Sequence, residues 1–229
     1  MSKNYKFTLL VLVLNEIDGL KDIVPKIEQN LFDKIIFVDG GSTDGSIDWL
    51  QENNFLVVHQ KNKGLGNAYL EGLRLTQDDF VITFSPDGNS DPSRLKEMVE
   101  VINTSNPDIL ICSRYLDWAK SDDDNLITGF GNWIFTKTFN ILYKQKITDY
   151  LVLYRAFKRS IVYELNVDEL AIAWQSQLIC RAAKANKKIL EIPGTEPKRI
   201  GGETKVSVIG NGFAELFMIF KEYLISKVN

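Results

Sequence analysis

Short runs of consecutive apolar residues mark the first half of the chain. They are rich in Val, Ile and Phe and cover residues 7–14, 34–38, 55–58, 80–84 and 109–112. Apolar residues follow one another in these runs instead of alternating with polar ones, which is typical of strands covered on both faces, as in a parallel sheet. Helical patterns separate them at residues 19–29, 46–53, 67–76 and 92–103. This strand–helix repetition predicts an open α/β sheet with right-handed crossovers.

The second half of the chain has a less regular pattern. A charged loop at 117–125 precedes a predicted helix at 130–143, a strand at 152–157, a helix at 171–185 and a short strand at 188–192. A loop rich in Gly, Pro and charged residues covers 193–205, and a final helix is expected at about 206–226. No internal repeat or low-complexity linker divides the halves, so we expect a single domain over residues 1–229.

The predicted last helix is unusually apolar. At helical spacing, one stripe consists of Phe213, Leu216, Phe217, Phe220 and Leu224, and the residues that flank it are Met218, Ile219 and Ile225. Packing against the sheet accounts for most of the stripe, because a surface helix buries one apolar face. The flanking residues are then available to a bilayer or to a partner.

Composition excludes several classes of protein. The chain has 27 Lys and Arg against 30 Asp and Glu, a formal charge of −3, which argues against a dedicated nucleic-acid-binding protein. With His59 as the single histidine, a cluster of His metal ligands is impossible. Cys112 and Cys180 lie in apolar runs and are expected to be buried thiols. No run approaches the ~20 apolar residues of a membrane span, so we expect a cytoplasmic protein, peripheral to a membrane at most.

In an open α/β sheet, ligands bind beyond the carboxyl ends of the strands. One predicted strand ends at Asp39 and is followed by Gly40, Gly41 and Ser42. A carboxylate there can accept a hydrogen bond from a base or a ribose hydroxyl. The alternative is an ordinary turn in which the aspartate is a local cap. The pattern alone leaves both interpretations open.

A second predicted strand ends in the loop SPDGNSDP. Asp87 and Asn89 are two residues apart with Gly88 between them, so their oxygens can converge on one point. Oxygen ligands with open positions suit Mg²⁺ or Mn²⁺ held together with a diphosphate. A plain turn before the helix that begins near Asp91 and Pro92 would leave Asp87 and Asn89 without a role.

The segment after the third predicted strand, Lys63-Gly64-Leu65-Gly66, is a weak match to a dinucleotide-binding fingerprint. The position of its third glycine is Tyr69, and no acidic residue closes a following strand. A loop whose glycines allow close approach to a ligand fits the segment better, although an ordinary loop leading into a helix remains an alternative.

Taken in order, these segments resemble family 2 glycosyltransferases of the GT-A fold, specifically the dolichol-phosphate mannosyltransferase-like branch. The resemblance covers nearly the whole chain. It rests on seven motifs in sequence: Asn15-Glu16, VDGGSTDGS (38–46), KGLGNAYLEGL (63–73), SPDGNSDP (85–92), CSRY (112–115), TDYLVLYRAFKR (148–159) and RIGGETKVS (199–207).

The resemblance implies an enzyme that moves a sugar from a nucleotide-diphosphate sugar to an acceptor with the help of Mg²⁺ or Mn²⁺. It implies a nucleotide-binding half at about 1–115 and an acceptor-side half at about 116–229. Asp87, helped by Asn89, would hold the cation. The residues implied for the nucleotide pocket are Leu12, Asn15, Glu16, Asp39, Gly41, Ser42 and Gly64.

The same resemblance suggests how an acceptor is bound. Arg114, Arg199 and Lys205 are the cations expected on phosphates of the donor or of an anionic acceptor. Relatives of this branch commonly use a polyprenyl phosphate, which is already ionised and needs no base. A hydroxyl acceptor would need one, and Asp149 is then the candidate.

Two departures from the family pattern keep another class of function open. Ser85 replaces the first aspartate of the Asp-x-Asp metal motif, and Gly40 replaces the second aspartate of the nucleotide turn. Their combined loss is compatible with a nucleotide-sugar-binding or scaffold protein that has little turnover. A nicotinamide-dependent oxidoreductase is a weaker rival, because the glycine pattern is incomplete.

Overall fold

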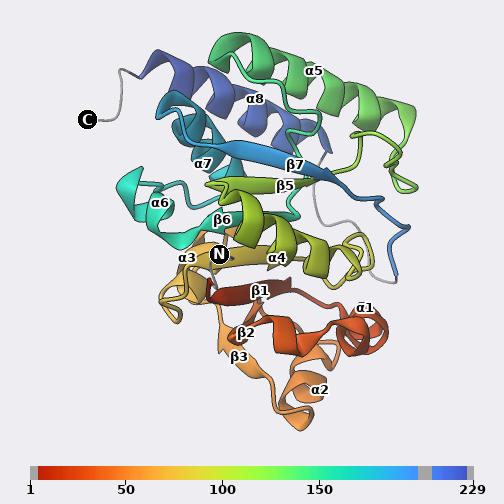
Figure 1. Ribbon diagram of the computed structural model, residues 1–229. Coiled ribbons are helices and arrows are strands. Elements are labelled where there is room, and N and C mark those ends of the chain that lie inside the picture. Colours follow the sequence, from red (N-terminus) through yellow and green to blue (C-terminus); the bar gives the residue numbers. More distant parts are fainter. Residues whose placement is uncertain (1–4, 201–207, 226–229) are drawn as a thin grey trace.

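A seven-stranded sheet forms the centre of the computed structural model, which describes residues 5–200 and 208–225 (Figure 1). The strand order is β3-β2-β1-β4-β6-β5-β7, and only β6 runs antiparallel to its neighbours. The predicted, mostly parallel α/β sheet is thus confirmed. The strands are β1 (Phe7–Val13), β2 (Lys34–Asp39), β3 (Leu56–His59), β4 (Phe80–Phe84), β5 (Ile109–Ser113), β6 (Arg155–Lys158) and β7 (Ile189–Pro193).

Helices cover the sheet. α3 packs on β1 and β2, α4 on β5, while α5, α7 and α8 contact one another, with α5 and α8 side by side at the top of Figure 1. Two 3-10 turns lie at Val24–Lys26 and Gln29–Leu31. The α-helices are α1 (Ile17–Ile23), α2 (Ser46–Glu52), α3 (Leu65–Leu73), α4 (Arg94–Ser105), α5 (Leu126–Tyr143), α6 (Arg159–Glu164), α7 (Trp174–Lys184) and α8 (Val208–Leu224).

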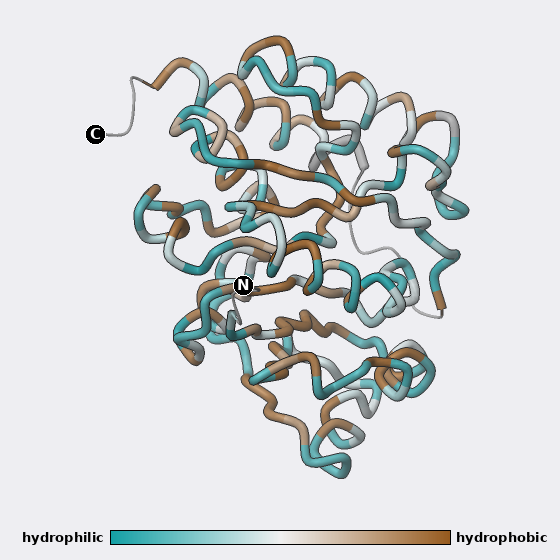
Figure 2. Tube along the Cα trace, in the orientation of Figure 1, coloured by the Kyte–Doolittle hydropathy of each residue, from teal (hydrophilic) through white to brown (hydrophobic). Residues whose placement is uncertain are grey.

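The central strands are apolar on both faces because helices lie on both sides of them. Every residue of β4 and β5 is buried, and the strands appear as brown segments through the middle of Figure 2. Burial of each large aliphatic or aromatic side chain stabilises the fold by roughly 1.5–3 kcal/mol. Cys112 and Cys180 are both buried free thiols, as the sequence predicts.

Several predicted boundaries were wrong. The helix expected at 19–29 is α1, which ends at Ile23, and the two 3-10 turns follow it. The helix expected at 130–143 begins at Leu126, because Asn125 and Thr128 form a reciprocal capping box that outweighs the two glycines in its first turns. The helix expected at 92–103 begins at Arg94, because Asp91 instead accepts hydrogen bonds from Ser93 N and Oγ. The strand expected at 152–157 is β6, which covers Arg155–Lys158. The short helix α6 after it was not predicted.

The last helix also differs from expectation. Met218 and Ile219, predicted as flanking residues, are buried, whereas Phe213, Phe217 and Leu224 of the predicted stripe are 71%, 67% and 79% exposed. α8 therefore packs through a face rotated from the predicted one, and its aromatic side faces outward. None of the described helices has the length and apolarity needed to cross a membrane.

Candidate active site

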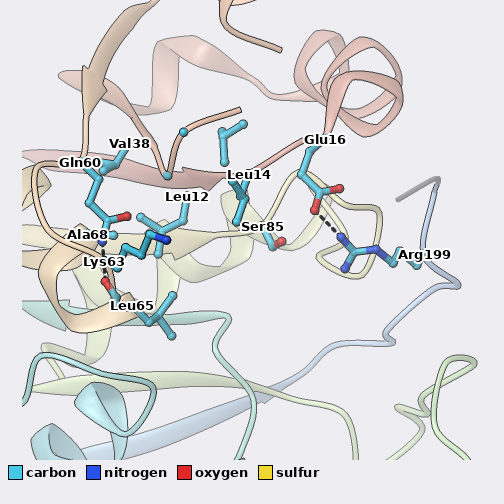
Figure 3. A pocket seen from close by; sticks show the side chains of 14 residues that line it. Leu12, Leu14, Glu16, Val38, Gln60, Lys63, Leu65, Ala68, Ser85 and Arg199 are labelled. Carbon is cyan, nitrogen blue, oxygen red and sulfur yellow. Dashed lines mark hydrogen bonds and ion pairs between the residues drawn. The ribbon is translucent and has the colours of Figure 1, made fainter. Parts of the chain in front are cut away.

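A cavity of about 780 Å³ opens at the carboxyl ends of β1, β2 and β3 (Figure 3). Parallel strands bring their following loops to the same edge of the sheet, which is where the polar segments of the sequence were expected to meet. Of the predicted nucleotide-pocket residues, Leu12, Glu16, Gly41 and Gly64 line this cavity. The other lining residues are Val13, Leu14, Val38, Gly40, Gln60, Lys63, Leu65, Ala68, Ser85 and Arg199.

Asp39 shapes the edge of the cavity without facing it. Its carboxylate accepts hydrogen bonds from Gly41 N (3.0 Å) and Ser42 N (2.9 Å), lies 3.2 Å from His59 Nδ1, and is 2% exposed. Burial alone would raise the pKa of Asp39, but the hydrogen bonds from Ser42, His59 and Gly41 lower it. The expected contact of Asp39 with base or ribose does not fit this geometry, because the carboxylate is used to hold the turn.

Asn15 and Ser42 join two loops beside the cavity. Asn15 N donates to Ser42 Oγ (2.9 Å), and Asn15 Oδ1 accepts from Thr43 N (2.7 Å). Asn15 adopts a left-handed conformation with φ of 54°, which asparagine tolerates better than most residues. These two predicted nucleotide-pocket residues therefore fix the β1–α1 loop to the β2–α2 turn, and neither lines the cavity.

Gly64 allows the loop before α3 to pack closely. A Cβ on Gly64 would lie 2.3 Å from Leu170 O, and its φ of 117° is one that side chains rarely adopt. The sequence analysis expected glycines here to allow close approach to a ligand, whereas the group packed against Gly64 is this chain's own backbone at Leu170.

The predicted metal loop lies at the end of β4. Asp87 Oδ1 accepts from Asn89 N (3.0 Å), and Asp87 Oδ2 accepts from Arg199 Nη1 (2.8 Å). Arg199 Nη2 also pairs with Glu16 Oε1. The structure thus brings together Glu16, Asp87 and Arg199, which are up to 183 residues apart. A backbone hydrogen bond from Ile200 N to Asp87 O (2.7 Å) holds the two segments in place.

The oxygen atoms of this loop fit a divalent cation. Asn89 Oδ1 is buried and, within the described parts of the chain, has no hydrogen-bond partner, while Asn89 Nδ2 is held by Asp123 Oδ2 at 3.0 Å. No group of three or more His, Cys, Asp or Glu residues forms a metal site among the described residues. Asp87 and Asn89 would therefore need further oxygens, which a diphosphate and water can supply.

A second cavity, of about 340 Å³, is lined in part by the metal loop. Ser85 lines both cavities. The position that departs from the family motif is therefore a small residue at their junction. The other residues that line the second cavity are Asp87, Asn89, Ser90, Cys112, Arg114, Leu151, Val152, Leu153, Tyr154, Gly194, Thr195 and Glu196.

Arg114 and Asp149 form a buried ion pair behind this second cavity. Arg114 Nε and Nη2 donate to Asp149 at 2.7 and 2.9 Å, and Arg114 N adds a third bond at 3.1 Å. Asp149 is 0% exposed. Burial alone would raise the pKa of Asp149, but the Arg114 guanidinium holds it below its usual value. The expected role of general base does not fit, because this carboxylate cannot reach an acceptor.

Glu196 was missed by the sequence analysis. It accepts from Arg114 Nη1 (3.2 Å) and from Ser121 Oγ, and it lines the second cavity together with Asp87. Burial raises the pKa of Glu196, although Arg114 opposes the shift. No local motif marks it, since Glu196 lies in a loop and is 82 residues from Arg114. Lys205, the remaining predicted phosphate contact, lies outside the described residues.

The chain is similar to known glycosyltransferases. The model of the family described as glycosyl transferase family 2 matches residues 8–165. An undecaprenyl-phosphate mannosyltransferase of Micrococcus luteus is 27% identical over 200 residues, which cover 82% of this chain and 79% of the relative. A UDP-N-acetylglucosamine–dolichyl-phosphate N-acetylglucosaminyltransferase of Methanococcus voltae is 25% identical over 208 residues, 81% of this chain and 83% of that relative.

Solved structures confirm the predicted GT-A fold. Glucosyl-3-phosphoglycerate synthase from Mycobacterium tuberculosis, in complex with Mn²⁺, UDP and phosphoglyceric acid, superposes with a TM-score of 0.76 at 15% identity. The match covers 97% of this chain and 80% of that one. At 15% identity, this structural similarity supports the assignment of the fold alone.

Proposed function

The chain belongs to glycosyl transferase family 2, and from that premise we propose that it transfers a sugar from a nucleotide-diphosphate sugar to a polyprenyl phosphate. The observation that carries the proposal is the junction of the two cavities. They meet at Ser85, beside the Asp87–Asn89 loop. A donor in the larger cavity would place its diphosphate next to that loop, with the sugar directed toward the second cavity.

In this arrangement the acceptor oxygen attacks the anomeric carbon of the sugar. The bond from that carbon to the diphosphate breaks, and its electron pair leaves with the nucleoside diphosphate. Mn²⁺ or Mg²⁺ held by Asp87 and Asn89 would supply Lewis-acid stabilisation of the leaving diphosphate. Arg199, which lies 2.8 Å from Asp87, is placed to bind a phosphate oxygen once the donor arrives.

Two observations favour a phosphate acceptor over a hydroxyl. Asp149, the expected base for a hydroxyl, is buried against Arg114, whereas an ionised phosphate needs no base. The second cavity also combines Arg114 with apolar walls at Leu151, Val152 and Leu153, which suits a lipid phosphate. The names of the relatives from Micrococcus luteus and Methanococcus voltae agree with such an acceptor. A binding or scaffold protein without turnover is less favoured.

Transfer to an organic-soluble acceptor tests the proposal. The purified chain would be incubated with labelled UDP-glucose, UDP-N-acetylglucosamine or GDP-mannose, Mn²⁺ and a polyprenyl phosphate in vesicles. We expect label from one donor to move into the lipid phase only when both the metal and the polyprenyl phosphate are present. Donor hydrolysis without lipid product, or transfer to a soluble sugar regardless of lipid, would contradict it.

We further propose that the paired outer faces of α5 and α8 lie on an anionic bilayer. The two helices pack together, and Tyr143 Oη donates to Ile219 O (2.8 Å). Large apolar side chains project from both helices and form the α5/α8 face, which consists of Ile127, Phe130, Trp133, Ile134, Ile141, Phe213, Phe217, Phe220 and Leu224. An exposed apolar patch of this kind marks an interaction site.

The charged residues of α5 and α8 favour a bilayer as the partner of the α5/α8 face. The charged residues of α5 and α8 are Lys137, Glu215, Lys221 and Glu222. Both glutamates are buried, so the exposed charges on these helices are lysines, although the whole chain has a net charge of −3. Aromatic residues with lysines on the same surface are typical of helices that lie in the membrane interface. The charged loop before α5 reaches Asn89 through Asp123, which connects this face with the site.

Phe130→Glu and Phe217→Glu should each weaken binding to vesicles containing anionic lipid by roughly tenfold or more, because burial of one such side chain contributes about 1.5–3 kcal/mol. Co-sedimentation with the vesicles measures the effect, and nucleotide binding should not change. Leu56→Glu is the matched control, since Leu56 is 50% exposed on the edge strand β3 at the opposite end of the sheet. Equal losses in all three variants, or none in either phenylalanine variant, would contradict the assignment.

A further inference from the structure

Gln60 is a polar residue in a largely aliphatic part of the larger cavity. It follows β3, and Gln60 N donates to Asp39 O (2.8 Å), so its backbone extends the pairing of β2 with β3. Its side chain points into the cavity (Figure 3). The neighbouring aliphatic lining residues are Leu12, Leu14, Val38, Leu65 and Ala68. Polar groups placed in a mostly apolar pocket wall fix the orientation of a ligand.

The orientation of the Gln60 amide follows from its partners. Nε2 donates to the backbone oxygens of Asn62 (2.5 Å) and Gly64 (2.6 Å). Because carbonyl oxygens only accept hydrogen bonds, the amide nitrogen must face them, and Oε1 must face the other way. Gln60 therefore presents a fixed, uncharged acceptor to the cavity. Within the described residues, Oε1 receives no hydrogen bond of its own.

Oε1 occupies the space above Gly40. A Cβ added to Gly40 would lie 3.6 Å from Gln60 Oε1 and 3.5 Å from Leu14 Cδ1, in ordinary contact with both. Gly40 is the position at which the family resemblance implies a second aspartate. The Asp39 carboxylate is bonded to the amides of the turn, and, leaving out the chain neighbours of Gly40, the side-chain acceptor closest to this point is Gln60 Oε1, from the loop after β3. Lys63, whose nitrogen also points into the cavity in Figure 3, adds a donor close by.

We infer that Gln60 recognises the base of the donor nucleotide. Its Oε1 accepts a hydrogen bond from a ring N–H that is next to a carbonyl group, as in uracil and guanine. Lys63 Nζ would donate to the neighbouring carbonyl oxygen. Cytosine and adenine present an amino group instead. Its second N–H would lie against the aliphatic wall without an acceptor, and a buried unpaired donor makes the binding free energy less favourable. The inference rests on the proposed function, because it presupposes a nucleotide donor.

Methylation of the ring nitrogen tests the contact without any transfer reaction. Binding of UDP, GDP, N3-methyl-UDP and N1-methyl-GDP would be measured by calorimetry on the wild-type chain and on Gln60→Ala. For whichever parent nucleotide binds, we expect methylation to weaken binding to the wild type by about tenfold, the size expected when one hydrogen bond is lost in a buried setting. Gln60→Ala should bind parent and methylated forms equally, and CDP and ADP should bind the wild type more weakly than the parent.

A rescue variant separates the hydrogen bond from a change of shape. Gly40 is not in the left-handed region, and a side chain there has room. The double variant Gly40→Asp with Gln60→Ala should regain the preference for the parent nucleotide, because a carboxylate at position 40 can accept the same N–H. Gln51→Ala, an exposed glutamine on α2, serves as the matched control and should behave as the wild type.

The outcomes distinguish this inference from the proposed function. If UDP or GDP binds and methylation costs the same in the wild type and in Gln60→Ala, Gln60 does not read the base, while the proposed function stands. Equal binding of all four bases to the wild type would also overturn the inference. If no nucleotide binds at all, the proposed function fails and the assignment of Gln60 fails with it.

Discussion

Asp87→Ala should abolish Mn²⁺-dependent binding of a nucleoside diphosphate and lower sugar transfer by about a thousandfold. Asp87 and Asn89 supply the oxygen atoms expected to hold the cation, and Asp87 carries the negative charge. Asn89 alone is a neutral ligand and cannot hold the cation. Lewis-acid stabilisation of a leaving diphosphate contributes several kcal/mol, and each 1.4 kcal/mol is about a factor of ten in rate. Calorimetry of UDP and GDP with and without Mn²⁺ measures the first effect, and the transfer assay the second.

The Asp87 variant should remain folded, because the side chain lines the second cavity and its lost partner Arg199 keeps its contact with Glu16. Asp122→Ala is the matched control: this exposed aspartate pairs with Lys120 on the loop before α5 and should leave metal dependence unchanged. Ser85→Asp, which restores the usual motif, should leave metal binding intact or tighten it. A wild-type response to Mn²⁺ in Asp87→Ala would remove Asp87 from the metal site.

The first half of the fold could be predicted because its signals are local. A strand buried on both faces, such as β4, must be a continuous apolar run, and the loop after it must carry the polar residues. The signal for β6 is weaker: the sequence predicts a strand at 152–157, whereas the paired residues are Arg155–Lys158. Its four residues include Arg155 and Lys158, and their strand conformation depends on pairing with β4 and β5, which are distant in sequence. Propensity gives way to tertiary context at such a strand.

The candidate site was also predictable only where its signals are local in the sequence. The sequence correctly indicated which loops meet, since strand ends define them. It could not indicate how each carboxylate is used. Asp39 bonds to amides two and three residues ahead, which a motif cannot distinguish from a ligand contact. The partner of Asp149 is 35 residues away, and Glu16 and Arg199 are 183 residues apart. These pairings depend on the packed structure, so they were found only there.

The buried pair of Arg114 and Asp149 leads to the second large effect. Asp149→Asn should lower the free energy of unfolding by about 3 kcal/mol at pH 7, because a buried guanidinium loses its charged partner. Glu196 offsets part of the loss, since it also contacts Arg114 at 3.2 Å. The pKa of Asp149 in the folded chain lies below its ordinary value of 3.8, so the ionised pair stabilises the fold above that pH. Its contribution falls as pH drops through the folded pKa.

Urea unfolding at pH 7 and in steps below pH 4 measures this effect, and the difference between wild type and Asp149→Asn should shrink as the solution becomes more acidic. The matched control is Glu222→Gln, which breaks a second buried pair with Arg181, at 2.8 Å, between α7 and α8. Both variants should lose stability, but only Asp149→Asn should also lose transfer, because Arg114 lines the acceptor-side cavity and Arg181 does not.

A double-mutant cycle separates positioning from base catalysis. If Asp149 acts by holding Arg114, the two changes Arg114→Ala and Asp149→Ala should be strongly non-additive in both stability and transfer, since the second change removes a partner already lost. Over the pH range in which both proteins stay folded, the pH dependence of the transfer rate should then be the same in Asp149→Asn as in the wild type. A variant that keeps wild-type stability but loses the acidic limb of the pH–rate profile would restore Asp149 as a general base. The bidentate geometry, with both carboxylate oxygens held by one guanidinium, makes the first result the expected one.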